Sequence, residues 1–446
     1  MQTRKDNQQT RMMLLPPIEK LMPKDHPLWG LNEVLDLSFV HEAVRGHYCQ
    51  DNGRPSVDPE VIIRLFLIQA IDGIPHIRGL MRQVQVNLAY RWFIGYGFDE
   101  KLPDHSTLSR ALDRLGDEVF NELFKRSIAQ CKASGLIEGR VLHVDATTIR
   151  ADLDKARVGE ADSSDPDARF GRFPDGQIRP GYKQQTVVDG HKRVIVGLSV
   201  SPANHVEGGD AVETVDQAVE QTDIKPAVVC ADAAYGSGRN RAVFERRGIR
   251  LVSPPPKPIT YTGKEYFTTE NFRYDENKDE FICPGECRLS FSAEDKERPG
   301  RRIYLARRSH CKSCSLKSKC TRSPRRQLKV GVYHAALIRL RADSKTDSFK
   351  RLYRSRAPVV EGVFAEAKQW HSLGRAWRRG LSKTRVQCLL IAAVINLKRL
   401  IGLFWLRNAP RLLPNALRRA IISLLGSLNQ ILCEIVLVET NVSEYC

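Results

Sequence analysis

The chain has 446 residues, of which 42% are hydrophobic and 27% charged, a balance that excludes a disordered protein and leaves room for two or three domains. Its 70 Lys and Arg against 52 Asp and Glu leave a formal net charge of +18, so we expect a polyanion, most often nucleic acid, as its partner. The first residues lack the apolar run of a secretory signal, which predicts a cytoplasmic protein. Polar side chains inside the apolar stretch 421–438 favour a packed terminal helix over a membrane span.

Short helices are predicted over the first 138 residues. Asp58 is a typical N-cap, Pro59 suits the first helical position, and Gly73 with Pro75 ends the segment. The stretch 103–116 repeats this pattern, with Asp104 or Ser106 as the cap. Short helices joined by tight turns suit a helix-turn-helix-like DNA-binding domain over 1–138, although most such bundles bind no DNA.

From residue 139 the pattern changes to strands. Three β-branched runs are followed by a helix, an apolar strand, a second helix and a short strand, over 139–151, 182–190, 193–205, 212–224, 225–232, 239–250 and 251–254. This order predicts a mixed α/β layer. Asp145 and Asp232 follow two of the apolar runs, so we expect both at strand ends.

Prolines at 254–258 open an insertion, predicted over 254–345. Between Arg298 and Lys329 it holds twelve Lys or Arg and no acidic residue. Its five cysteines, two of them separated by two residues, predict a structural zinc site, with an iron–sulfur cluster or five unliganded thiols as alternatives: Cys283, Cys287, Cys311, Cys314 and Cys320.

Helical sequence returns near residue 348 and contains Glu361 within a strongly basic stretch. From Lys350 to Arg385 there are ten Lys or Arg and two Glu. An Asp at a strand end is more often a turn-former or cap than a ligand. Three carboxylates that converge, however, repel one another unless divalent cations neutralise them, and such hard oxygen ligands select Mg²⁺ or Mn²⁺. Asp145, Asp232 and Glu361 together therefore predict a two-metal site for phosphodiester chemistry.

The motifs HVDATTIRAD, GYKQQTVVD, SPANHVE, CADAAYGS and YRSRAPVVEGVFAEAK resemble those of a bacterial insertion-sequence DDE transposase. SVDPEVIIRLFLIQ and PDHSTLSRAL resemble the InsH-type N-terminal domain of that group, and the closing helices match as well, so the resemblance covers roughly residues 50–400. It implies a multidomain protein: a helical N-terminal domain, a ribonuclease H-like (retroviral-integrase-like) catalytic domain over 139–400 that the Cys-rich insertion interrupts, and a helical tail over 401–446.

The resemblance also implies site residues. Asp145, Asp232 and Glu361 would be the catalytic metal-binding triad, and the family's Tyr, Arg, Glu, Lys signature falls on Tyr353, Arg356, Glu361 and Lys368. Arg356 and Glu361 have four residues between them where three are expected, so Arg354 competes for the Arg role. Pro358 fits the first position of a helix. The zinc ligands would be Cys283, Cys311, Cys314 and Cys320, with Cys287 in reserve.

The function that the resemblance implies is DNA transposition: Mg²⁺- or Mn²⁺-dependent cleavage at the inverted-repeat ends of a mobile element and strand transfer into target DNA. A homodimer in the DNA complex and a place on the bacterial nucleoid, away from membranes, are expected with it. Two alternatives remain. One is a ribonuclease H-like nuclease without strand transfer, and the other is a catalytically inactive DNA-binding derivative.

Overall fold

The computed structural model describes residues 16–48, 56–206, 208–256 and 266–412, so the predictions for 421–438 and for most of the tail lie outside the described residues. The chain divides into two compact units, Met1–Ser134 with Ala393–Cys446, and Gly135–Ala392. The long helix α15, Leu381–Leu412, passes from the second unit into the first, whereas the sequence assigned it to the catalytic domain as far as residue 400.

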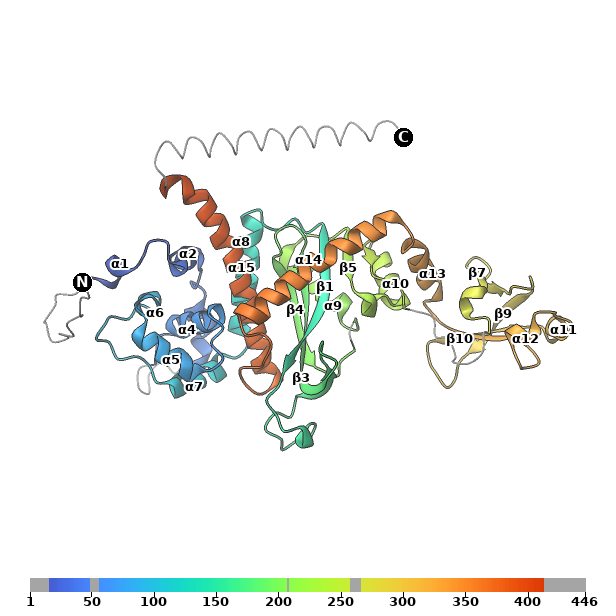
Figure 1. The fold of residues 1–446 in the computed structure, drawn as a ribbon, viewed down its shortest axis with the longest axis horizontal. Helices are drawn as coiled ribbons and strands as arrows, with labels where there is room; N and C mark the ends of the chain where they lie inside the picture. The colour runs from blue at the N-terminus through green and yellow to red at the C-terminus, as the bar shows by residue number, and fades with distance from the viewer. Residues whose placement is uncertain (1–15, 49–55, 207, 257–265, 413–446) are drawn as a thin grey trace, which may run out of the picture. The chain divides into compact units, whose positions relative to one another are not determined.

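The first unit is helical, as predicted (Figure 1). Asp58 Oδ1 accepts a hydrogen bond from the Glu60 N–H at 2.8 Å, and Asp104 Oδ1 accepts one from the Ser106 N–H at 2.8 Å. These two N-caps begin α4 and α7. The helices are α1 (Ile18–Leu21), α2 (Pro27–Val34), α3 (Val40–Ala43), α4 (Pro59–Ile71), α5 (Ile77–Val86), α6 (Leu88–Phe93), α7 (His105–Leu115) and α8 (Glu118–Ala133).

The second unit contains a six-stranded mixed sheet. Its strands are β1 (Val141–Arg150), β2 (Arg169–Arg172), β3 (Ile178–Asp189), β4 (Ile195–Pro202), β5 (Val228–Ala231) and β6 (Arg250–Val252). β3 pairs antiparallel with β1, β2 and β4, while β1 pairs parallel with β5 and β5 with β6. The predicted succession of strands and helices is confirmed here, and β2 is an addition to it.

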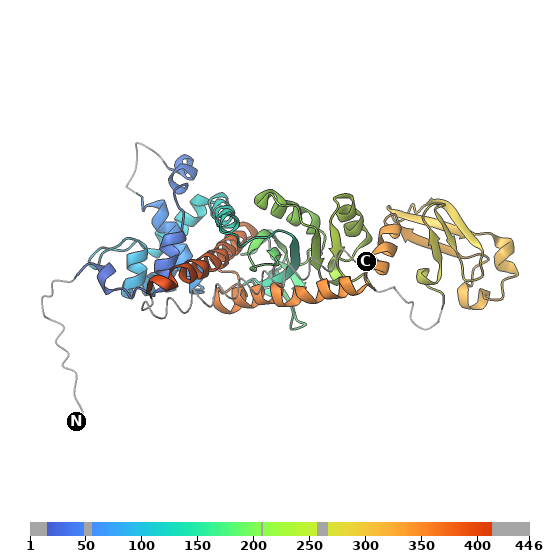
Figure 2. The same ribbon diagram turned by 90° about the horizontal axis from the view of Figure 1, so that it is seen from above.

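Helices cover both faces of this sheet (Figure 2). α9 (Ala211–Thr222) packs on β3 and β4 and α10 (Gly238–Arg246) on β6, whereas α14 (Asp347–Trp370) packs on β1, β5 and β6. α14 begins at Asp347, as the return of helical sequence near residue 348 predicted, and Pro358, which suits a first helical position, lies inside it. A proline inside a helix removes one backbone hydrogen bond. The helix continues past Pro358 because its buried side chains, which include Phe349, Val360 and Val363, pack against the sheet on both sides of the proline.

Between β6 and α13 (His334–Asp343) the chain forms a separate five-stranded antiparallel sheet whose strands the sequence did not predict. They are β7 (Arg273–Asp275), β8 (Glu280–Ile282), β9 (Arg288–Glu294), β10 (Arg301–Ala306) and β11 (Gln327–Gly331). Phe281, Leu289 and Tyr304 are central to its small core. α11 (Arg308–Lys312) and α12 (Lys317–Cys320) lie between β10 and β11, at one end of this sheet (Figure 1).

One helix in the described residues is long and apolar enough to cross a membrane by length and composition. It is the Leu381–Phe404 part of α15, and 72% of its most apolar window is buried inside the protein. Burial of this kind is what the core helix of a globular protein shows.

Candidate active site

Asp145 and Asp232 lie side by side on neighbouring parallel strands. The last paired residues of β1 and β5 are Val144 and Ala231, and the two aspartates come directly after them. Asp232 directly follows the last residue of β5, so it stands at the strand end as predicted, and its Oδ1 accepts a hydrogen bond from the Ala234 N–H at 3.0 Å. Asp145 does not end β1. That part of the prediction was wrong, because antiparallel pairing with β3 carries β1 on to Arg150.

Arg356 of α14 lies against this pair of carboxylates. Its Nη1 is 2.6 Å from Asp145 Oδ2, and the two side chains are only 12% and 18% exposed. Burial raises the pKa of Asp145, and the nearby Asp232 carboxylate raises it further, while the Arg356 guanidinium acts in the opposite direction. The result is a raised pKa for Asp145. The described site is therefore a pair of neighbouring carboxylates, of which Asp145 is paired with the Arg356 guanidinium.

Glu361 does not join them. It lies on the exposed side of α14, and five residues at about 100° each turn it about 140° away from Arg356. We expected Glu361 to face the strand ends and Glu366 to point to solvent, and this orientation was wrong. The Glu366 side chain is 15% exposed and lies 3.9 Å from the buried His371. In the part of the chain that the structure describes, no three His, Cys, Asp or Glu side chains are grouped to hold a metal ion.

The phase of α14 explains this arrangement. Its inward stripe continues through Val360, Val363 and Ala367 at spacings of three and four, and Arg356 falls on the same stripe. The contact between Arg356 and Asp145 was not predicted, although this spacing places Arg356 on the inward face of α14.

The other predicted DNA-binding residues of α14 differ in exposure. Arg354 is exposed to solvent. Tyr353 stacks on Phe349 with ring centroids 6.3 Å apart, and the Arg356 guanidinium lies 5.9 Å from the Tyr353 ring centre. Burial lowers the pKa of Lys368. Of these residues, Arg354 is thus the one most open to a ligand.

The five cysteines of the insertion gather at the end of its sheet. The Cys287 N–H donates to Cys283 Sγ at 3.3 Å across the turn between β8 and β9. A Cβ on Gly285 would lie 3.5 Å from Cys314 Sγ and 3.7 Å from Cys283 Sγ. Burial raises the pKa of Cys320, which also senses the neighbouring Cys283, Cys311 and Cys314. All five are free thiols, and Cys287 senses Cys283, Cys314 and Cys311, but within the described residues no three of them are grouped closely enough to hold a metal ion.

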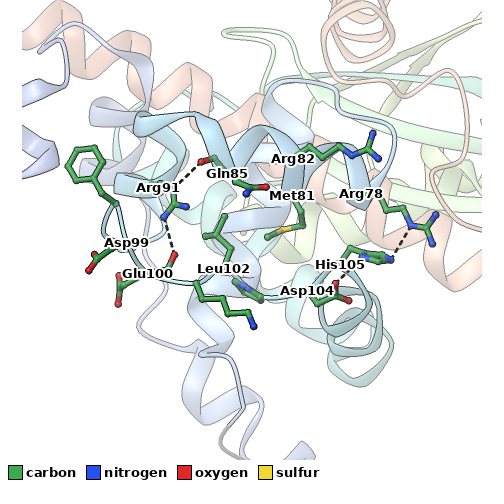
Figure 3. A pocket seen from close by; sticks show the side chains of 13 residues that line it. Arg78, Met81, Arg82, Gln85, Arg91, Asp99, Glu100, Leu102, Asp104 and His105 are labelled. Atoms are coloured by element: carbon green, nitrogen blue, oxygen red, sulfur yellow. Dashed lines mark hydrogen bonds and ion pairs between the residues drawn. The ribbon is translucent and has the colours of Figure 1, made fainter. Parts of the chain in front are cut away.

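The helical unit has a concave surface of its own, a cavity of about 640 Å³ between α5, the start of α7 and the loop before it (Figure 3). Buried Arg91 shapes it by donating from Nη1 to the Gly97 carbonyl at 2.6 Å and to the Glu100 carbonyl at 3.2 Å. At the rim, Arg78 Nε donates to His105 Nε2 at 3.0 Å. Both signs of charge line the cavity, so it favours no single class of ligand.

Two family models match the chain, the Transposase domain (DUF772) over residues 16–114 and the Transposase DDE domain over residues 282–401. The second range includes α14 and the cysteines, whereas Asp145 and Asp232 lie between the two ranges. No curated protein matches.

Among solved structures, a piggyBac transposase synaptic complex with hairpin DNA aligns with 89% of this chain and 84% of that one, at 12% identity and a TM-score of 0.35. The Mos1 mariner paired-end complex with Mn aligns with 46% of this chain and 61% of that one, at 14% identity and a TM-score of 0.16. These TM-scores are too low to establish a common fold.

Proposed function

We infer that this chain, which belongs to the DDE transposases, cuts DNA at the ends of an insertion sequence and joins those ends to target DNA through Asp145, Asp232 and Glu361. The observation that carries the residue assignment is the adjacency of Asp145 and Asp232 on parallel β1 and β5. The order and directions of the six-stranded sheet support our proposal that the second unit is ribonuclease H-like.

The carboxylate pair fits a divalent cation by its donor chemistry. Two partly buried carboxylates side by side need a positive charge, and Arg356 supplies it in this structure. We propose that Asp145 and Asp232 hold Mg²⁺ or Mn²⁺ once Arg356 has released Asp145. Glu361 faces solvent in this structure, so we propose that it completes the set when α14 turns about its axis, a movement that also withdraws Arg356. A bound ion of this kind lowers the pKa of an attacking water and stabilises charge on the phosphate.

The reaction that we propose has two steps. A water oxygen bonds to the phosphorus at the element end, and the 3′ oxygen leaves as a hydroxyl. That hydroxyl then bonds to a target phosphorus and displaces a second 3′ oxygen. Arg354, Tyr353 and Lys368 would hold phosphates of the bound strands, as would Arg356 once Asp145 has released it. We further propose a homodimer in the DNA complex and a cytoplasmic, nucleoid-bound protein.

For the insertion we propose a structural zinc ion. Thiols in a turn, with others on two short helices beside it, are suitable donors for tetrahedral zinc. Cys283, Cys311, Cys314 and Cys320 are the proposed ligands and Cys287 the alternative.

The test of the function uses Asp232→Asn, which keeps the oxygen that accepts from Ala234 but loses the charge. With DNA carrying the element ends and Mg²⁺, the wild type should cut and join, and Asp232→Asn should do neither while still binding the ends. The matched control is Asp223→Asn, at an exposed position with φ of 51° that Asn tolerates.

Each result decides between the candidate functions. Cutting without joining by the wild type would identify the nuclease alternative, and binding without cutting would identify an inactive derivative. Full activity of Asp232→Asn, or of the wild type in excess chelator, would overturn the metal-dependent assignment.

A further inference from the structure

The insertion carries a group of cations that are left without carboxylate partners. We call Arg307, Arg308, Lys312, Lys317 and Lys319 the insertion tip. Four are exposed and Lys317 is half-buried, and none makes an ion pair within the described residues. They lie on and beside α11 and α12, at the cysteine end of the sheet (Figure 1).

Elsewhere in the insertion some cations have carboxylate partners. Arg302 pairs with Asp279 at 3.4 Å, and Lys329 pairs with Asp295 at 3.0 Å. The tip has no such carboxylates on its own segment, since residues 298–329 contain no acidic residue at all. The turn between β8 and β9, which carries Cys283 and Cys287, contains one acidic residue, Glu286. The charge at the tip is thus concentrated and largely uncompensated.

The backbone under the tip is well fixed. Arg326 donates from Nη1 to the Cys320 carbonyl at 2.6 Å and from Nη2 to the Phe267 carbonyl at 2.8 Å, which holds the end of α12 to the start of the insertion. Cys311 and Cys320 pack against the hydrophobic core of the sheet. Arg308 and Lys312, four residues apart on α11, project from one side of that helix. Cations on a fixed support lose less entropy on binding than cations on a free loop.

We propose that the insertion tip is a second DNA-binding surface, which binds the phosphate backbone independently of the base sequence. It lies at the end of the five-stranded sheet, whereas the carboxylate pair lies on the six-stranded sheet. Charge complementarity selects the partner, because duplex DNA presents about one negative charge per 1.7 Å of its axis to a cluster of this kind. The tip offers cations and no large exposed apolar side chain. This favours a phosphate backbone over an apolar peptide or a lipid interior. The proposal rests on the transposase function inferred above.

The experiment compares two triple variants of the full chain that lose the same charge. The first is Arg308→Gln with Lys312→Gln and Lys319→Gln, at the tip. The second is Lys155→Gln with Lys192→Gln and Lys225→Gln, three exposed cations on other elements. Affinity for a duplex without element ends is measured over a series of salt concentrations in chelator, so that no cleavage occurs.

The tip variant should lower the slope of log affinity against log salt by about 2 to 3, since each lost phosphate contact removes about 0.9. The control triple should leave the slope within about 0.5 of wild type, because scattered charges make no backbone contact. Exchanging Arg308→Lys, Lys312→Arg and Lys319→Arg should keep the wild-type slope. If the tip triple does not fold, Lys319→Gln alone should still lower the slope by about 0.9.

Equal slopes for the two Gln triples would overturn the proposal. So would a tip triple that binds DNA normally but no longer binds vesicles of anionic lipid, because the surface would then serve a membrane. This binding assay needs no catalysis. If the wild type fails to cut DNA but the tip triple still lowers the slope of log affinity against log salt, the proposed function is contradicted and the proposal for the insertion tip still stands.

Discussion

Arg356 places its guanidinium beside Asp145 and its neighbour Asp232, where two partly buried carboxylates need a positive charge. Arg356 reaches Asp145 because α14 lays its inward stripe across β1 and β5. Removing the arginine alone would leave a partly buried carboxylate uncompensated, a change that typically costs about 3–5 kcal/mol for a buried pair. Glu361, by contrast, is exposed and stabilises no described part of the fold, so its substitution separates catalysis from stability.

We therefore predict different effects for the two glutamates of α14. Glu361→Gln should abolish cleavage without shifting the melting temperature, because an exposed side chain loses only its charge. Glu366→Gln should keep cleavage, while its partly buried position beside His371 makes a lower melting temperature the expected change. Cleavage assays and thermal melts of both proteins test this. A fully active Glu361→Gln protein would remove Glu361 from the triad.

At the scale of the element, α13 connects the two sheets of the second unit. One end of the helix contacts the six-stranded sheet and the other end contacts the insertion. Asp343 is 2.6 Å from Arg250 Nη2 and 3.0 Å from Arg241 Nη1, which ties the helix to β6 and α10. His334, at the other end, packs against Tyr274 and Phe281 of the insertion, with ring centroids 5.5 and 5.1 Å away. Burial first, and Arg341 second, lower the pKa of His334 to about 4.

This shift predicts that the protein loses stability in acid. The unfolded chain takes up a proton on His334 near pH 6.5 and the folded chain only near 4, so stability that is present above 6.5 falls as the pH drops through this window. The melting temperature of the wild type should fall between pH 7 and pH 5, and that of His334→Phe should fall less. Exposed His191→Asn is the control and should follow the wild type. Parallel curves for all three proteins would contradict the prediction.

At the scale of the whole molecule, the insertion has a small hydrophobic core of its own within the described residues. Its buried cluster holds seven residues, few for an independent sheet, and small domains of this kind usually need a metal or disulfides to stay folded. Its cysteines are free thiols. The proposed zinc ion would meet this need.

Protein purified without chelator should accordingly contain about one zinc per chain. Chelation should create a separate low-temperature unfolding transition from the insertion and leave the transition of the other sheet in place. Cys314→Ser should mimic chelation, and comparison of Cys287→Ser with Cys320→Ser should identify the fourth ligand. Zinc-free protein with an unchanged melting curve would leave the cysteines as ordinary thiols.

Much of this protein could be predicted from the sequence because the signals are local. The charge of +18 pointed to a polyanion, the caps Asp58 and Asp104 marked helix starts, and the β-branched runs marked β1, β3 and β4. The family motifs indicated a transposase, in agreement with both family models.

Tertiary structure decided what depends on packing between distant segments. Parallel pairing of β1 with β5 brings Asp145 beside Asp232, 87 residues further along the chain. The phase of α14 is set by which side chains it buries against the sheet, so Arg356 faces inward and Glu361 outward even though the motif groups them together. A strand or helix pattern fixes only the period of its side chains, and the burial surface of its neighbours fixes the direction in which they point.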